Sequence, residues 1–174
     1  NGFGGSGNHL IAGPLTSSGG CEYQVVAFPY LYETASLHPL YLVVYVVQGL
    51  TRPGFDFARH PASVLSNGDL GWIQSTSFFV TGLLLIAGAA GMRRALHPGR
   101  AGTWGPLLFG LSGLAMMAAA VCSAAPVDGF PPGTPAGPPT TISTTGLLHF
   151  LVAMVGFLAW IVASGVTPMF HGRW

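Results

Sequence analysis

The stretch RPGFDFARHPASVLSNGDLGW, residues Arg52 to Trp72, is polar and rich in turn-forming residues, and it lies between two apolar runs. This pattern is typical of a loop that joins two membrane helices. Within the loop, Pro61 suits the first turn of a short helix, and Asn67-Gly68 supplies its left-handed end. We expect four apolar side chains of the loop to rest on the bilayer surface, namely Phe55, Phe57, Val64 and Leu65.

The composition on both sides of this loop is that of a membrane protein. Half of the residues are hydrophobic and only 6% are charged, whereas an ordinary soluble domain has roughly a quarter charged residues. The net charge is +1 with no basic or acidic block, which excludes the electrostatic surface that nucleic-acid binding requires. All six basic residues are Arg, a bias that indicates a GC-rich bacterial genome. Cys21 and Cys122 lie far apart, and we predict no disulfide.

Three uncharged runs are long enough to cross a membrane, because a span of the hydrocarbon core needs about 20 apolar residues. They cover residues 72–92, 103–125 and 145–166. A fourth run, residues 34–51, has His38 and Pro39 near its start, and we expect a short or interrupted helix there. A re-entrant or interfacial segment is the alternative for this run.

Each clear span has a face of small residues, which favours close packing of helices in lipid. The alternative is that glycine and alanine are simply common in this genome. The small residues are Ser75, Gly82 and Ala89 in the first span, Gly110, Gly113, Ala120 and Ala124 in the second, and Ala153, Gly156 and Ala163 in the third. The sequence therefore predicts an all-α integral membrane helix bundle of about four transmembrane helices over residues 34–174, with a short helix in the loop 52–71. Residues 1–33, rich in Gly and Ser near their start, are predicted to form a loosely structured tail.

The charges of the links predict an orientation in the cell membrane. The link from Arg93 to Gly102 has three Arg and no acid, whereas the link from Pro126 to Thr144 has six Pro, one Asp and no basic residue. Because Arg-rich links stay in the cytoplasm, the loops 52–71 and 126–144 are predicted outside and the amino end inside. The proline-rich outer loop favours extended polyproline II structure and resembles a semi-rigid strap.

Several polar residues are predicted to converge on the outer face, and the last helix carries the most informative one. His149 shares a stripe with Ala153, Gly156 and Ala163, opposite the lipid-facing stripe of Phe150, Met154, Phe157 and Ile161. An inward ionisable group within a span indicates a functional site. The alternative is an imidazole that bonds a loop carbonyl and holds the strap down. We expect its hydrogen-bond partner between Arg59 and Asp69. The candidate binding residues are Arg59, His60, Ser63, Ser66, Asp69 and His149, with Asp128 beside them.

The chemistry of these candidates favours binding over catalysis. Ser63 or Ser66 with His149 and an Asp would supply a nucleophile and a base, but there is no GxSxG motif. Metal-ligand spacings such as HExxH and CxxC are absent from the sequence, so we predict no metal and no cofactor. Arg59 and His60 are suited to the phosphate of a lipid headgroup. We therefore favour a structural or lipid-contacting membrane protein, with membrane lipid as its partner. The alternative is a small membrane enzyme or transporter component with an outer pocket around His149 and loop 52–71.

Four sequence segments support a family resemblance. QGLTRPGFDFARHPASVLSNGDLGWIQ, FFVTGLLLIAGAAGMRRAL, GFPPGTPAGPPTT and GLLHF follow one another from Gln48 to Phe150. Their order and spacing resemble a family of bacterial multi-pass membrane proteins called domain of unknown function 998, over about Leu40 to Trp174. The resemblance implies a membrane protein without an established activity. It also implies about six helices, so that we expect this chain to be a fragment. Relatives tend to have an acid where this chain has Ala125, and often a His where it has Thr145.

Overall fold

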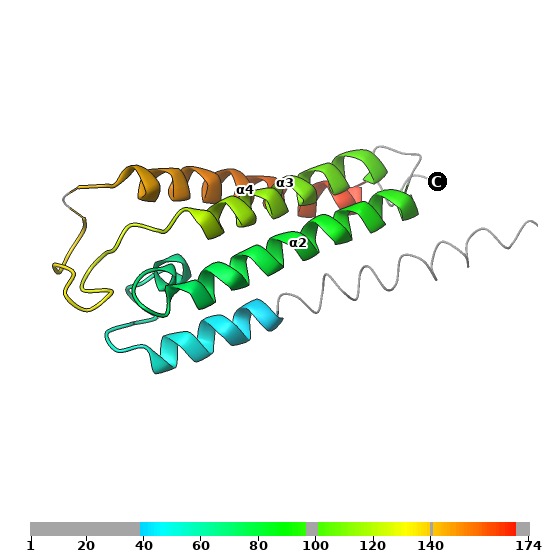
Figure 1. Ribbon diagram of the computed structural model, residues 1–174. Coiled ribbons are helices and arrows are strands. Elements are labelled where there is room, and N and C mark those ends of the chain that lie inside the picture. Colours follow the sequence, from blue (N-terminus) through cyan, green and yellow to red (C-terminus); the bar gives the residue numbers. More distant parts are fainter. Residues whose placement is uncertain (1–38, 97–100, 140, 170–174) are drawn as a thin grey trace, which may run out of the picture.

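In the part of the chain that the structure describes, three long helices and one shorter helix pack side by side, and Figure 1 shows their arrangement. The computed structural model describes residues 39–96, 101–139 and 141–169. The first helix, Pro39–Thr51, is followed by the 3₁₀ helix η1 (Ala62–Ser66), and then by α2 (Gly71–Leu96), α3 (Ala101–Val121) and α4 (Thr144–Met169). The all-α prediction is confirmed, and so is the short helix in the first loop. The predicted tail, residues 1–33, and residues 34–38 lie outside the described residues.

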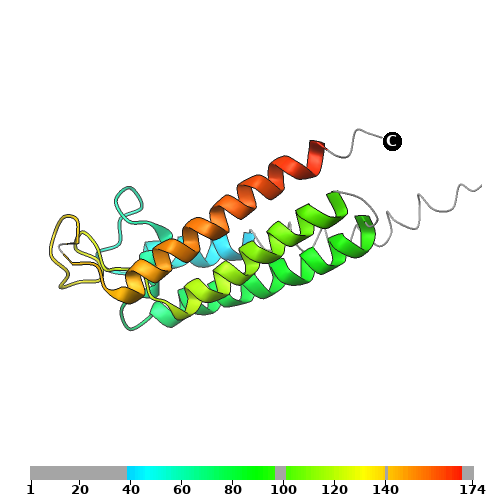
Figure 2. The same cartoon turned by 90° about the horizontal axis from the view of Figure 1, so that it is seen from above.

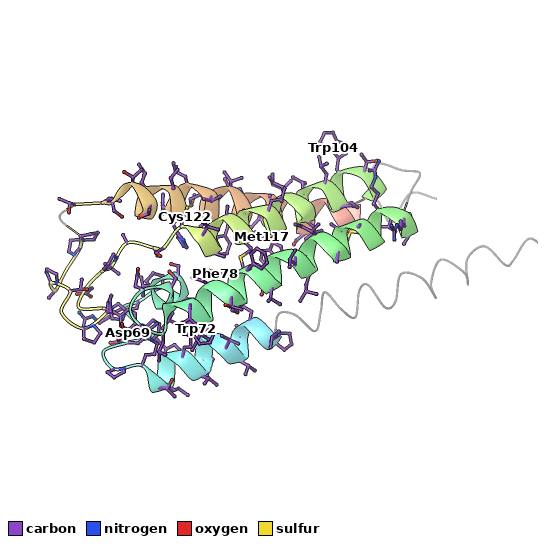
Figure 3. All side chains as sticks on the ribbon, in the orientation of Figure 1. Asp69, Trp72, Phe78, Trp104, Met117 and Cys122 are labelled. Atoms are coloured by element: carbon purple, nitrogen blue, oxygen red, sulfur yellow. The ribbon has the colours of Figure 1, made fainter. Side chains whose placement is uncertain are left out.

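The helices α2, α3 and α4 are each long and apolar enough to cross a membrane. From Trp72 to Arg93, α2 extends about 30 Å at 1.5 Å per residue, which matches the thickness of the hydrocarbon core. Trp72 and Trp104 are exposed and lie toward opposite ends of the bundle (Figure 3). Aromatic residues at these positions are typical of the two membrane interfaces.

The predicted helix bounds are too short for α2 and α4 and too long for α3. The run 103–125 is apolar to its end, but α3 stops at Val121. The reason is tertiary: beyond that point the Ala124 N–H donates a hydrogen bond to Ser66 Oγ at 3.3 Å, and the Cys122 carbonyl accepts one from His149. The Ala124 N–H thus bonds Ser66 in place of a helical acceptor, whereas the Cys122 N–H keeps its helical bond to the Ala118 carbonyl at 3.1 Å. The Cys122 carbonyl has no helical donor, because residue 126 is proline and lacks an N–H, and it is free to accept from His149.

Glycine allows α2 and α3 to touch through their backbones. A Cβ added at Gly82 would lie 2.6 Å from the Gly113 carbonyl oxygen, and one added at Gly113 would lie 2.7 Å from that of Gly82. On its other side α3 packs against α4 (Figure 2). Ser112 Oγ donates a hydrogen bond of 3.0 Å to the Gly156 carbonyl there. The small-residue faces therefore lie between helices, as predicted at these positions.

Two loops meet at one end of the bundle, which we call the loop end (Figure 1). The first loop is residues 52–70, and the second is residues 122–143 apart from 140. Val64 and Leu65 of the first loop form a small core with Ala124 and Phe130 of the second. The expectation that Val64 and Leu65 rest on the bilayer is wrong, because the second loop covers them and leaves both buried.

Candidate functional site

The Arg52 side chain contacts backbone carbonyls of the first loop and an aromatic ring of the second loop. Its Nη1 and Nη2 each donate a 2.5 Å hydrogen bond, to the Leu65 and Asn67 carbonyl oxygens. The guanidinium also lies 4.9 Å from the centre of the Phe130 ring, a favourable cation–π distance. Burial lowers the pKa of Arg52, and the negative charge of Asp69 opposes that change. The planar Arg52 guanidinium thus fixes the backbone of the first loop at both Leu65 and Asn67.

His60 is held through both of its ring nitrogens. Nδ1 accepts a hydrogen bond of 3.0 Å from the Asp56 backbone N–H, and Nε2 lies 3.1 Å from the backbone oxygen of Asp128. Since a carbonyl oxygen only accepts, Nε2 is the nitrogen that donates. The buried imidazole also packs against the rings of Phe55 and Phe130. His60 is therefore engaged in joining the two loops.

Arg59 and Asp128 form an ion pair across the two loops. Arg59 Nε donates to Asp128 Oδ2 at 2.8 Å, and Nη2 lies 2.6 Å from Oδ1. The Gly137 N–H also donates to Oδ1, at 2.8 Å. The Arg59 guanidinium, helped by that N–H, lowers the pKa of Asp128 from 3.8 to about 2.

This shift predicts how acid affects the loops. Because the folded-state pKa of Asp128 lies below the ordinary 3.8, the ion pair stabilises the folded loops above that pH, and the contribution is lost as pH falls through about 2. We expect Asp128→Asn to lower the unfolding temperature in detergent slightly at neutral pH and not at the acid end. The effect is small because Arg59 is half exposed. If the difference in unfolding temperature between Asp128→Asn and the wild type stayed constant down to pH 2, the assignment would be contradicted. Adding Arg59→Gln to Asp128→Asn should lower the unfolding temperature little further, because the ion pair is already lost.

The two serine candidates lie in η1, and Asp69 lies in the turn before α2. Ser66 is buried, and its Oγ donates to the Ser63 carbonyl at 2.7 Å while accepting from the Ala124 N–H. Ser63 is partly buried. Asp69 is exposed. The structure therefore brings Arg59, His60 and Ser66 into contacts between the loops, and it leaves Asp69 on the surface.

His149 points inward from the second turn of α4, as predicted, and is only 5% exposed. Its Nδ1 lies 2.5 Å from the Cys122 carbonyl oxygen, just past the end of α3. The last carbonyls of a helix lack intrahelical partners, and this N–H satisfies one of them. The expected partner between Arg59 and Asp69 is wrong, because α3 ends earlier than predicted and places its own terminal carbonyl beside the imidazole. The ring also packs 6.1 Å from that of Phe78 on α2.

A groove of about 560 Å³ opens beside His149, between α2 and α4 and over α3. It extends along α4 from Gly146 to Trp160, and Ser63 and Val64 of η1 lie at its loop end. Its apolar walls and floor include Phe78 and Leu85 of α2, Ala115 and Ala119 of α3, and Phe150 and Phe157 of α4. Phe150 and Phe157 are more than half exposed on the rim, as the predicted lipid-facing stripe requires. Of the six candidate residues, Ser63 and His149 share this groove.

The sequence model of one protein family matches residues 38–174, a region that contains both loops and the groove; the family is described as Protein of unknown function (DUF998). The chain belongs to this family. The DUF998 match covers the region in which the resemblance was predicted, and it assigns no activity. No curated protein and no solved structure is detectably similar to the chain.

Sequence reasoning missed Arg52, Phe130 and a buried glutamine pair in this DUF998 chain. Gln48 Nε2 donates to Gln74 Oε1 at 2.7 Å, joining the first helix to α2. The signal for the pair was present, since each is a lone amide in an apolar run. Nothing local distinguishes Phe130 from the other aromatic residues of the loops. Within the described ranges, no three His, Cys, Asp or Glu side chains gather as a metal site would require.

Proposed function

We propose that this chain is a lipid-binding membrane protein whose groove holds an acyl chain. The observation that carries this proposal is the groove itself. Its extent along α4, from Gly146 to Trp160, corresponds to about 21 Å at 1.5 Å per residue. One leaflet of the hydrocarbon core is about 15 Å thick, half of the total. The groove is therefore long enough to hold an extended acyl chain over the full depth of one leaflet.

The lining chemistry supports the same occupant. The groove is almost entirely apolar, and its described lining residues include no Asp, Glu, Lys or Arg. Its volume lies in the range of about 300–1,000 Å³ that is typical of small-molecule sites. The exposed rim residues Phe150 and Phe157 belong to α4, which is long and apolar enough to cross the membrane, so that lipid can enter from the side.

We expect a larger side chain in the groove to displace the acyl chain. The test uses a fatty probe with a photoreactive diazirine on its chain, crosslinked to the purified protein in lipid nanodiscs and mapped by mass spectrometry. Ala153 lines the groove, so Ala153→Phe should reduce adducts on groove residues at least several-fold. Leu151→Phe is the matched control, because Leu151 is exposed on α4 and outside the groove. Equal labelling of both variants would contradict the proposal.

We also propose that the loop end faces the outside of the cell membrane and that the amino end lies in the cytoplasm. Support comes from Arg93 and Arg94 in the last turn of α2, at the end opposite the two loops. Positive residues of this kind stay in the cytoplasm.

The orientation predicts which cysteines an impermeant thiol reagent reaches in intact cells. Ser66 is buried and therefore unsuitable as a reporter, whereas Ala58 and Ala136 are exposed in the two loops. After Cys21 and Cys122 are replaced by Ala, Ala58→Cys and Ala136→Cys should react, and Ala101→Cys should react only after permeabilisation. The reverse pattern would overturn the orientation.

A further inference from the structure

His149 is a polar residue of the groove whose hydrogen-bonding capacity is only half used. Nδ1 of His149 faces the Cys122 carbonyl oxygen at 2.5 Å. A carbonyl only accepts, so Nδ1 carries the proton, and the neutral ring then has an acceptor lone pair on Nε2. Among the residues that the structure describes, none donates a hydrogen bond to Nε2. The side chain is only 5% exposed and lines the groove, so Nε2 is a buried acceptor without a donor among the described residues.

The position of His149 places the donor close to the loop end of the groove. His149 lies five residues into α4 from Thr144, which is about 7 Å along the helix axis. Ser63 and Val64 of η1, with Ala125 and Val127 of the second loop, line the groove around that end. A group that reaches Nε2 therefore lies beside these loop residues, at the end of the groove where the loops meet α4.

The charges of the site restrict the donor further. A phosphate or carboxylate headgroup needs a cation beside it, and the described lining has none. The two cations of the first loop are already occupied, Arg52 by the Leu65 and Asn67 carbonyls and Arg59 by the Asp128 carboxylate. An ammonium headgroup would meet no anion in the groove either. An uncharged O–H group satisfies these conditions.

We propose that the groove selects lipids that end in an uncharged hydroxyl, such as a long-chain alcohol or a diacylglycerol, and that His149 Nε2 accepts the hydrogen bond of that hydroxyl. This inference rests on the proposed acyl-chain site and names its ligand class. His149 is then the residue that determines specificity, while the apolar walls hold the chain. Its Nδ1–H bond to the end of α3 fixes the orientation and the tautomer of the ring.

The variant His149→Asn distinguishes the role of Nδ1 as a donor from the role of Nε2 as an acceptor. The amide Nδ2–H of Asn takes the place of the imidazole Nδ1–H and can still cap the Cys122 carbonyl. The Asn Oδ1 then takes the place of the ring Cδ2, so that no acceptor remains at the position of Nε2. His149→Phe removes both functions and serves as the second variant. Thermal unfolding in detergent reports whether each variant still folds.

The experiment compares two diazirine probes with the same chain, a photoreactive octadecanol and its methyl ether, on the full chain in phosphatidylcholine nanodiscs. We expect the alcohol to label groove residues of the wild type about two- to tenfold more than the ether, the range that one hydrogen bond supplies. In folded His149→Asn the two probes should label equally, with the ether level unchanged.

The outcomes distinguish this inference from the acyl-chain site on which it rests. Equal labelling by both probes in the wild type, still sensitive to Ala153→Phe, would refute hydroxyl selection and leave the acyl-chain site standing. Labelling that is insensitive to Ala153→Phe would refute the acyl-chain site itself. A third probe, with phosphocholine on the same chain, should label less than the alcohol; stronger labelling would show that a charged headgroup is preferred and would also refute the selection.

Discussion

Gly82→Leu should prevent α2 and α3 from packing and should abolish the folded bundle. A Cβ alone would lie 2.6 Å from the Gly113 carbonyl oxygen and 3.1 Å from the Met117 backbone nitrogen. Backbone atoms cannot rotate away as a side chain does, so the helices must separate along their contact. Overpacking in a core that adapts costs about 1–3 kcal/mol. Here the obstacle is backbone, and we expect a loss above that range.

The effect of Gly82→Leu is measured by thermal unfolding in detergent and by the yield of monodisperse protein. Gly165→Leu is the matched control, because nothing lies within 4 Å of a Cβ added at Gly165. That control should unfold close to the wild-type temperature. If Gly82→Leu also unfolded close to the wild-type temperature, the close approach of α2 and α3 would be wrong.

Phe130→Ala should separate the two loops at the loop end. Phe130 is 0% exposed, its ring lies 5.4 Å from that of Phe55, and Arg52 lies over its face. Replacing a fully buried Phe by Ala costs about 3–5 kcal/mol, from the lost transfer of the ring out of water and the cavity left behind. The change also removes the aromatic partner of the Arg52 guanidinium, which adds to the loss.

Limited proteolysis of the first loop is the direct measurement, because it detects local opening even where the membrane helices remain folded. We expect cleavage after Arg59 to become much faster in Phe130→Ala. Phe79→Ala is the control, since Phe79 of α2 is exposed. A cleavage rate that does not change would show that Phe130 does not hold the loops together.

The membrane helices could be predicted from sequence because hydrophobicity and length alone decide them. The end of α3 could not, since residues 122–125 are as apolar as the helix before them. Pro126 removes the helical donor to the Cys122 carbonyl, but the turns before it are set by the bonds to Ser66 and His149, which are distant in sequence. Such bonds depend on the completed fold and leave no local pattern.

In the candidate site, too, local sequence predicted some features, whereas others depend on the completed fold. The inward position of His149 followed from helical periodicity, and Ser63 and His149 do share a groove. The hydrogen-bond partner of His149 did not follow, because it depends on where another helix stops. Arg59 and His60 were assigned to headgroup phosphate from their chemistry alone. In the structure each is bonded to Asp128, a residue whose approach to the first loop no spacing rule indicates.

The core of the loop end has a consequence for biogenesis. Val64 and Leu65 reach the ribosome exit long before Phe130, which completes their packing. At about 5–20 residues per second, the 65 residues that follow Leu65 up to and including Phe130 take roughly 3–13 s to synthesise. During that interval the first loop has an incomplete core with its apolar side chains uncovered. A nascent chain arrested before residue 130 should therefore hold its first loop open to protease, and release beyond the second loop should close it.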